Sequence, residues 1–110
     1  NVSAAFHSKF MIEAQEELSK YIENIFFKKN KIKIITNYDA GIYSDSFNIK
    51  NNLKNQMANK VNWTQSIKRL EEIGEKKIIE MGPNKVLSGL IRRITNKFDI
   101  TSIDTIADLK

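Results

Sequence analysis

The chain has 110 residues, of which 41% are hydrophobic and 28% charged, so it can form one small globular domain with a modest core rather than a disordered segment. It contains no cysteine and one histidine, which excludes disulfides and a thiol nucleophile, and we expect no metal site. Its net charge of +5 comes mostly from lysines spread along the chain without a basic, aromatic-rich stripe, so we expect no nucleic-acid partner.

The first half of the chain predicts two helices and two short strands. Residues 2–6 have the composition of a strand end that runs into a loop at His7. Apolar residues at three- and four-residue steps predict an amphipathic helix over residues 10–26. A β-branched run predicts a strand at 32–36, and Asp45 or Ser46 is placed to cap a second helix that extends to residue 57.

The second half alternates helices and strands. Thr64 is the expected N-cap of a helix that Gly74 closes. The further elements expected are a strand at 77–81, a turn at 82–84, a helix at 86–94, a strand at 98–103 and a short terminal helix from Asp104. Such alternation predicts an α/β fold with a parallel or mixed sheet, and we expect residues 1–110 to be one segment without an internal domain boundary.

His7 is the residue with the clearest catalytic potential, because an imidazole can act as a general base near neutral pH. However, the chain has no cysteine and no serine in a Gly-x-Ser-x-Gly turn, so a nucleophile is not evident. Two interpretations remain open from the residues alone. His7 is either an ordinary loop histidine or the base of an enzyme whose nucleophile lies outside this chain.

Four ordered motifs over about residues 2–94 resemble the C-terminal part of malonyl-CoA:acyl carrier protein transacylases, the acyltransferases of fatty acid and polyketide synthesis. The first motif, at residues 2–8, is VSAAFHS, similar to the family's catalytic-histidine motif. The others are IITNYDA at 34–40, QM at 56–57 followed by VNWTQS at 61–66, and EMGPNKVLSGL at 80–90. Asn84 replaces a usual glycine, and we expect it to tolerate the same left-handed turn.

The resemblance implies a fold and a reaction. The fold would be the C-terminal part of an α/β-hydrolase-like large subdomain, with the ferredoxin-like subdomain and the nucleophile elbow outside this chain. The complete enzyme would transfer a malonyl group from CoA to the phosphopantetheine thiol of acyl carrier protein through a malonyl-serine intermediate. Malonyl-CoA and phosphopantetheinylated acyl carrier protein would be its substrates, with no bound cofactor.

The resemblance also assigns three site residues. His7 would be the general base and acid, the main-chain carbonyl of Gln56 would orient it, and Phe6 would favour malonyl over methylmalonyl groups by its bulk. The arginine that pairs with the malonyl carboxylate in the family has no match here. The 110 residues alone are therefore expected to be inactive, with the N-terminal part of the same enzyme as a necessary partner.

The competing interpretation is a non-catalytic basic module that binds an acidic protein or RNA. No apolar run is long enough for a membrane span, so we expect no membrane partner, and the cytoplasm is the expected compartment.

Overall fold

A computed structural model describes residues 4–109, which form two compact units that divide between Ser66 and Ile67. The boundary falls inside helix α3 (Trp63–Glu72). No helix among the described residues is long and apolar enough to cross a membrane. The expectation of one segment without an internal boundary stays a prediction.

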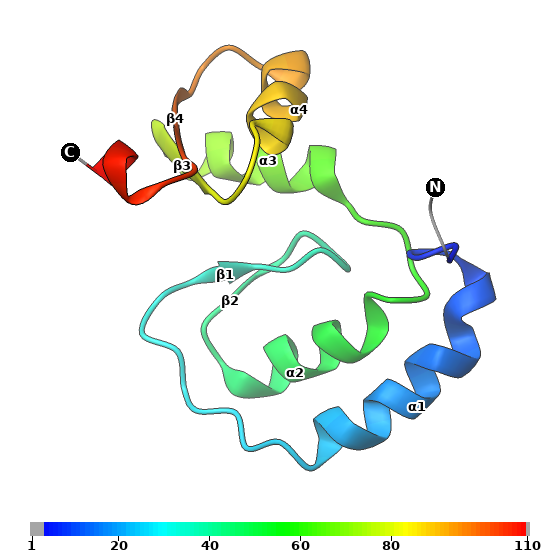
Figure 1. The fold of residues 1–110 in the computed structure, drawn as a ribbon. Coiled ribbons are helices and arrows are strands. Elements are labelled where there is room, and N and C mark those ends of the chain that lie inside the picture. The colour runs from blue at the N-terminus through cyan, green and yellow to red at the C-terminus, as the bar shows by residue number, and fades with distance from the viewer. Residues whose placement is uncertain (1–3, 110) are drawn as a thin grey trace. The chain divides into compact units, whose positions relative to one another are not determined.

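The first unit is built on two packed helices, α1 (Ile12–Glu23) and α2 (Ser46–Asn55), which lie side by side in Figure 1. A 3₁₀ turn, η1 (Lys9–Met11), precedes α1. In the chain segment that connects the two helices, β1 (Ile34–Ile35) pairs antiparallel with β2 (Ile42–Tyr43). The buried apolar side chains of this unit are Ile22, Ala40, Ile49 and Ala58.

The second unit has a parallel ladder of β3 (Lys77–Met81) and β4 (Asp99–Ile103). Helix α4 (Val86–Ile94) forms the crossover that parallel strands require, and a 3₁₀ turn, η2 (Ile106–Leu109), follows β4. Ile67 and Ile91 are each 2% exposed and form its apolar centre.

Several sequence predictions are confirmed. Strand 77–81 and helix 86–94 have the predicted bounds, and strand 98–103 begins one residue later. Asp45 caps α2, because its Oδ1 accepts a hydrogen bond of 2.8 Å from the Asn48 N–H. Asn84 adopts the expected left-handed conformation, with φ 73°.

Other predictions are wrong in their bounds. The predicted helix 10–26 ends at Glu23, because the Asn24 side chain and Lys50 Nζ donate to the carbonyls of Lys20 and Glu23. Thr64 is not an N-cap, since α3 begins at Trp63. The terminal turn starts at Ile106 and not at Asp104. The N–H groups of Asp104 and Thr105 instead donate hydrogen bonds to the Asp108 carboxylate.

The strand predictions for the first unit also need correction. The run 32–36 contributes only Ile34–Ile35, and its antiparallel partner β2 was not predicted. Residues 4–6 are not a strand, and residues 2 and 3 of that prediction lie outside the described residues.

Candidate active site

His7 lies in a tight loop before η1 and has an unusual backbone. Its φ is 62°, a left-handed conformation that costs a non-glycine residue about 1–2 kcal/mol. Local bonds close the loop: Ser8 Oγ donates to the Ala5 carbonyl at 2.6 Å, and the Met11 N–H donates to the Ser8 carbonyl at 3.0 Å. Strained backbone of this kind persists only where surrounding contacts hold it.

Those contacts come from the segment that follows α2. The His7 N–H donates to the Met57 carbonyl at 2.8 Å, and the ring Nδ1 lies 2.8 Å from the Gln56 carbonyl oxygen. A carbonyl only accepts hydrogen bonds, so the proton of the neutral ring is assigned to Nδ1. The lone pair is then on Nε2, the arrangement of a general base.

Gln56 and Met57 can offer their carbonyls because α2 ends just before them. The last carbonyls of a helix have no partner within it, and they carry the partial negative charge of the helix C-terminus. Asn59 Nδ2 satisfies the Asn55 carbonyl at 2.8 Å, which leaves the next two carbonyls for His7. A ring that gains positive charge during catalysis is favoured at this end of a helix.

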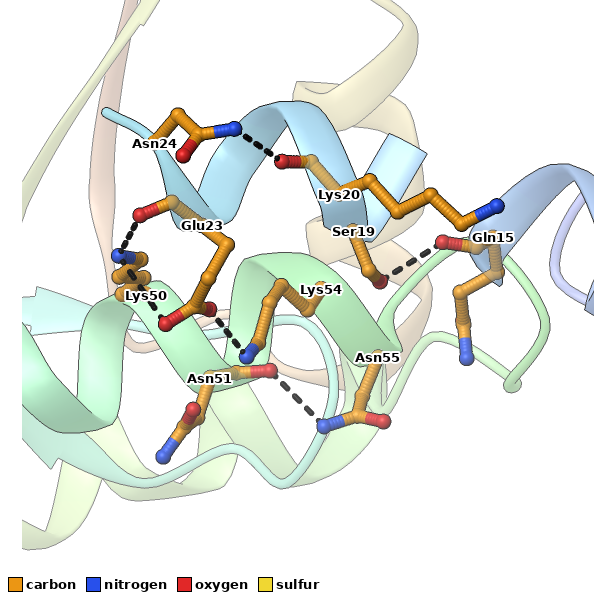
Figure 2. Close-up of polar contacts among 9 residues, drawn as sticks. All are labelled: Gln15, Ser19, Lys20, Glu23, Asn24, Lys50, Asn51, Lys54 and Asn55. Atoms are coloured by element: carbon orange, nitrogen blue, oxygen red, sulfur yellow. Dashed lines mark hydrogen bonds and ion pairs between the residues drawn. The ribbon is translucent and has the colours of Figure 1, made fainter. Parts of the chain in front are cut away.

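A charged cluster also links α1 to α2, between the C-terminal end of α1 and the middle and last turn of α2. Figure 2 shows Glu23 of α1 facing Lys50 and Lys54 of α2. Lys54 Nζ donates to Glu23 Oε2 at 2.8 Å, and Lys50 Nζ donates to the Glu23 carbonyl at 2.6 Å. The hydrogen bond from Lys54, with the charge of Lys50, lowers the pKa of Glu23.

The loop between β1 and β2 is organised by the Asp39 carboxylate. It accepts hydrogen bonds from Thr36 Oγ1, the Gly41 N–H and the Tyr43 hydroxyl, at 2.7–2.8 Å, and from Asn52 Nδ2 at 3.2 Å. Partial burial raises the pKa of Asp39, but these hydrogen bonds outweigh it, and the pKa lies below its ordinary value.

Within this loop, Asn37 connects to Gln56. Asn37 Nδ2 donates to Gln56 Oε1 at 3.4 Å, a long hydrogen bond. Both residues line a cavity of about 220 Å³ whose other walls are mainly apolar. The apolar wall residues are Ile34, Ile35, Ile49 and Leu53.

The structure brings two of the three predicted site residues into direct contact, His7 and Gln56. Phe6 precedes His7 and is 54% exposed. The sequence did not single out the Met57 carbonyl or the Asn37 side chain as parts of the site. Both residues lie within the motifs, but the motifs do not show that these groups contact His7 and Gln56. Within residues 4–109, no group of three or more His, Asp or Glu side chains could hold a metal ion.

The fourth motif forms a separate polar cluster in the second unit. Glu80 is 8% exposed, and its carboxylate accepts from the backbone N–H groups of Leu87 and Ser88 at 2.8 Å and from the Ser88 hydroxyl. These bonds, the one from the Ser88 hydroxyl foremost, lower the pKa of Glu80. Glu80 therefore replaces a local N-cap for α4, whose first turn it ties to β3.

No family model matches the chain. Among curated proteins, it is 43% identical over 97 residues to the polyketide biosynthesis protein PksE of Bacillus subtilis, covering 88% of this chain and 12% of PksE. It is 37% identical over 109 residues to the malonyl CoA-acyl carrier protein transacylase of Staphylococcus aureus, covering 99% of this chain and 35% of that protein. The chain thus spans about one third or less of the relatives it matches.

The chain is also similar to solved structures of malonyl transferases. An acyl carrier protein S-malonyltransferase from Vibrio cholerae superposes with a TM-score of 0.92 at 34% identity, over 99% of this chain and 36% of that one. A malonyl-transacylase in complex with a type II PKS acyl-carrier protein gives 0.92 at 30% identity, over 98% and 35%.

The mixed α/β fold is therefore that of a segment of an acyltransferase, as the four motifs predicted. Within that class, the chain matches a segment of the malonyl-CoA:acyl carrier protein transacylases.

Proposed function

We propose that the complete protein transfers a malonyl group from CoA to the phosphopantetheine thiol of acyl carrier protein, with His7 as the general base and acid. The observation that supports this most directly is the 2.8 Å hydrogen bond between His7 Nδ1 and the Gln56 carbonyl, which leaves Nε2 as the basic nitrogen. The activities of the relatives named above support the same reaction class.

In the first half-reaction, a serine hydroxyl attacks the thioester carbonyl of malonyl-CoA while His7 Nε2 takes its proton. The tetrahedral intermediate collapses, the carbon–sulfur bond breaks, and the imidazolium returns the proton to the departing CoA thiolate. The Gln56 carbonyl stabilises the imidazolium by accepting its Nδ1–H. The products are free CoA and a malonyl-serine ester.

In the second half-reaction, the phosphopantetheine thiol of acyl carrier protein gives its proton to His7 and attacks the ester. The proton then returns to the serine oxygen as the ester bond breaks, which restores the enzyme. Acyl carrier protein as the partner is supported by the names of the relatives and by the solved complex of a malonyl-transacylase with such a carrier.

The nucleophilic serine lies, in this proposal, in a part of the protein outside these 110 residues. No serine in residues 4–109 forms a hydrogen bond to His7, and several are held by other groups. The segment alone is then inactive and needs the N-terminal part of the enzyme. Phe6, next to His7, selects malonyl groups because its ring leaves no room for an α-methyl.

The test is mass spectrometry of the full-length protein after incubation with malonyl-CoA. A malonyl adduct on a serine outside this segment is expected, and His7→Asn should slow its formation by about 10²- to 10⁴-fold. Lys9→Ala, at an exposed residue of the 3₁₀ turn that follows the loop, is the matched control and should form the adduct normally. An adduct on residues 1–110 alone would show that the nucleophile lies inside the segment.

A further inference from the structure

The peptide group between Met57 and Ala58 is held on both sides by residues of the His7 region and α1. Its carbonyl accepts from the His7 N–H at 2.8 Å, and its N–H donates to the side-chain Oε1 of Gln15 on α1, also at 2.8 Å. Because a peptide group is planar, two bonds at its opposite ends fix the orientation of the whole plane.

The preceding peptide group, between Gln56 and Met57, carries the carbonyl that contacts His7 Nδ1. If the Met57–Ala58 plane rotates, the backbone at Met57 rotates with it. The Gln56 carbonyl oxygen then no longer points at His7 Nδ1. Ala58 is 9% exposed, so water does not readily replace Gln15 as the acceptor for its N–H. Gln15 therefore connects α1 to the acceptor of the candidate base.

We propose that Gln15 is a positioning residue for His7, which acts through the Met57–Ala58 peptide to keep the Gln56 carbonyl on Nδ1 and so keeps the lone pair on Nε2. This inference rests on the proposed function of His7 as a general base. Gln15 touches neither the substrate nor the ring. Its effect is on the fraction of molecules whose histidine has the reactive tautomer and orientation.

The experiment uses two variants of the full-length protein. Gln15→Met keeps the length of the side chain but removes the acceptor, whereas Gln15→Glu keeps an oxygen that can accept from the Ala58 N–H. Gln65→Met, on an exposed position of α3, is the matched control for the loss of a glutamine amide. Two readouts are taken: steady-state malonyl transfer, and ring-nitrogen NMR of labelled histidine, with the His7 signals assigned by their loss in His7→Asn.

For Gln15→Met we expect kcat to fall about fivefold, as for the loss of one hydrogen bond, with KM for malonyl-CoA within about twofold. The NMR spectrum should show a new population with the proton on Nε2. Gln15→Glu should restore both readouts, and Gln65→Met should change neither. A merely structural role for Gln15 would lower the melting temperature without moving the tautomer.

An unchanged tautomer and kcat in Gln15→Met overturns the proposal, and so does an equal kcat loss in the Met and Glu variants with the tautomer unchanged. The NMR readout does not require turnover. Full activity of His7→Asn would therefore refute the proposed function separately, while the tautomer measurement would still decide whether Gln15 orients the ring.

Discussion

Replacing Gln56 by alanine tests whether the main chain, rather than the side chain, orients His7. The side-chain amide of Gln56 makes one long hydrogen bond of 3.4 Å to Asn37, whereas the carbonyl that contacts His7 is retained in any residue. A hydrogen bond at the weak end of the range is worth about 0.5 kcal/mol, which corresponds to roughly a twofold change in rate. We expect Gln56→Ala to keep kcat within that factor.

A second perturbation of the same site acts on the oxygen itself. Exchanging the amide between Gln56 and Met57 for an ester weakens this carbonyl as an acceptor and leaves the side chain in place. We expect the ester to lower kcat more than Gln56→Ala does, since it weakens the contact to Nδ1 directly. Both variants would be assayed as full-length enzyme by transfer of radiolabelled malonyl groups, with melting temperature as the folding control.

The opposite order of effects would contradict orientation of His7 by the main chain. A loss of more than about tenfold in a well-folded Gln56→Ala enzyme, beside near-normal activity of the ester, would assign the function to the side-chain amide.

Three further changes test other parts of the chain. Phe6→Ser should raise methylmalonyl transfer relative to malonyl transfer by about tenfold or more in a competition assay; an unchanged ratio would remove Phe6 from the specificity site. Ile91→Ala, at a side chain 2% exposed, should lower the free energy of unfolding in urea by about 2–4 kcal/mol, and a loss below about 1 kcal/mol would mean that α4 is not packed as described. Because the pKa of Glu80 is lower in the folded state than its ordinary 4.5, its contribution to stability is present above that pH and is lost as the pH falls below it. The melting temperature of Glu80→Gln should therefore depend less on acid than that of the parent, and parallel curves would contradict this.

The sequence predicted best the elements whose signals are local. Asp45 caps α2 through a residue three positions away, and the strand at 77–81 is a continuous β-prone run, so both were visible in short windows. The β1–β2 ladder escaped because two-residue strands have no detectable alternation. The end of α1 was misplaced because Lys50, 27 residues further along the chain, satisfies its last carbonyl.

The candidate site also combines residues with local sequence signals and contacts between residues far apart in the chain. His7 stood out by its chemistry and Gln56 by its place in a motif, but the residues alone gave no reason to place them together. Gln15 occupies an ordinary helix position between glutamates and alanine, and only the folded chain shows that its amide oxygen reaches the Ala58 N–H.

The separation of 49 residues between His7 and Gln56 has a consequence for how the protein matures. The histidine cannot be aligned by its own loop, whose left-handed backbone is unfavourable until the end of α2 has arrived. During synthesis and folding, the imidazole thus lacks its hydrogen bond to the Gln56 carbonyl until α1 and α2 have packed together. A partly folded chain therefore does not hold the ring in a fixed orientation. In the proposed mechanism, His7 therefore becomes able to accept a proton only once this tertiary contact has formed.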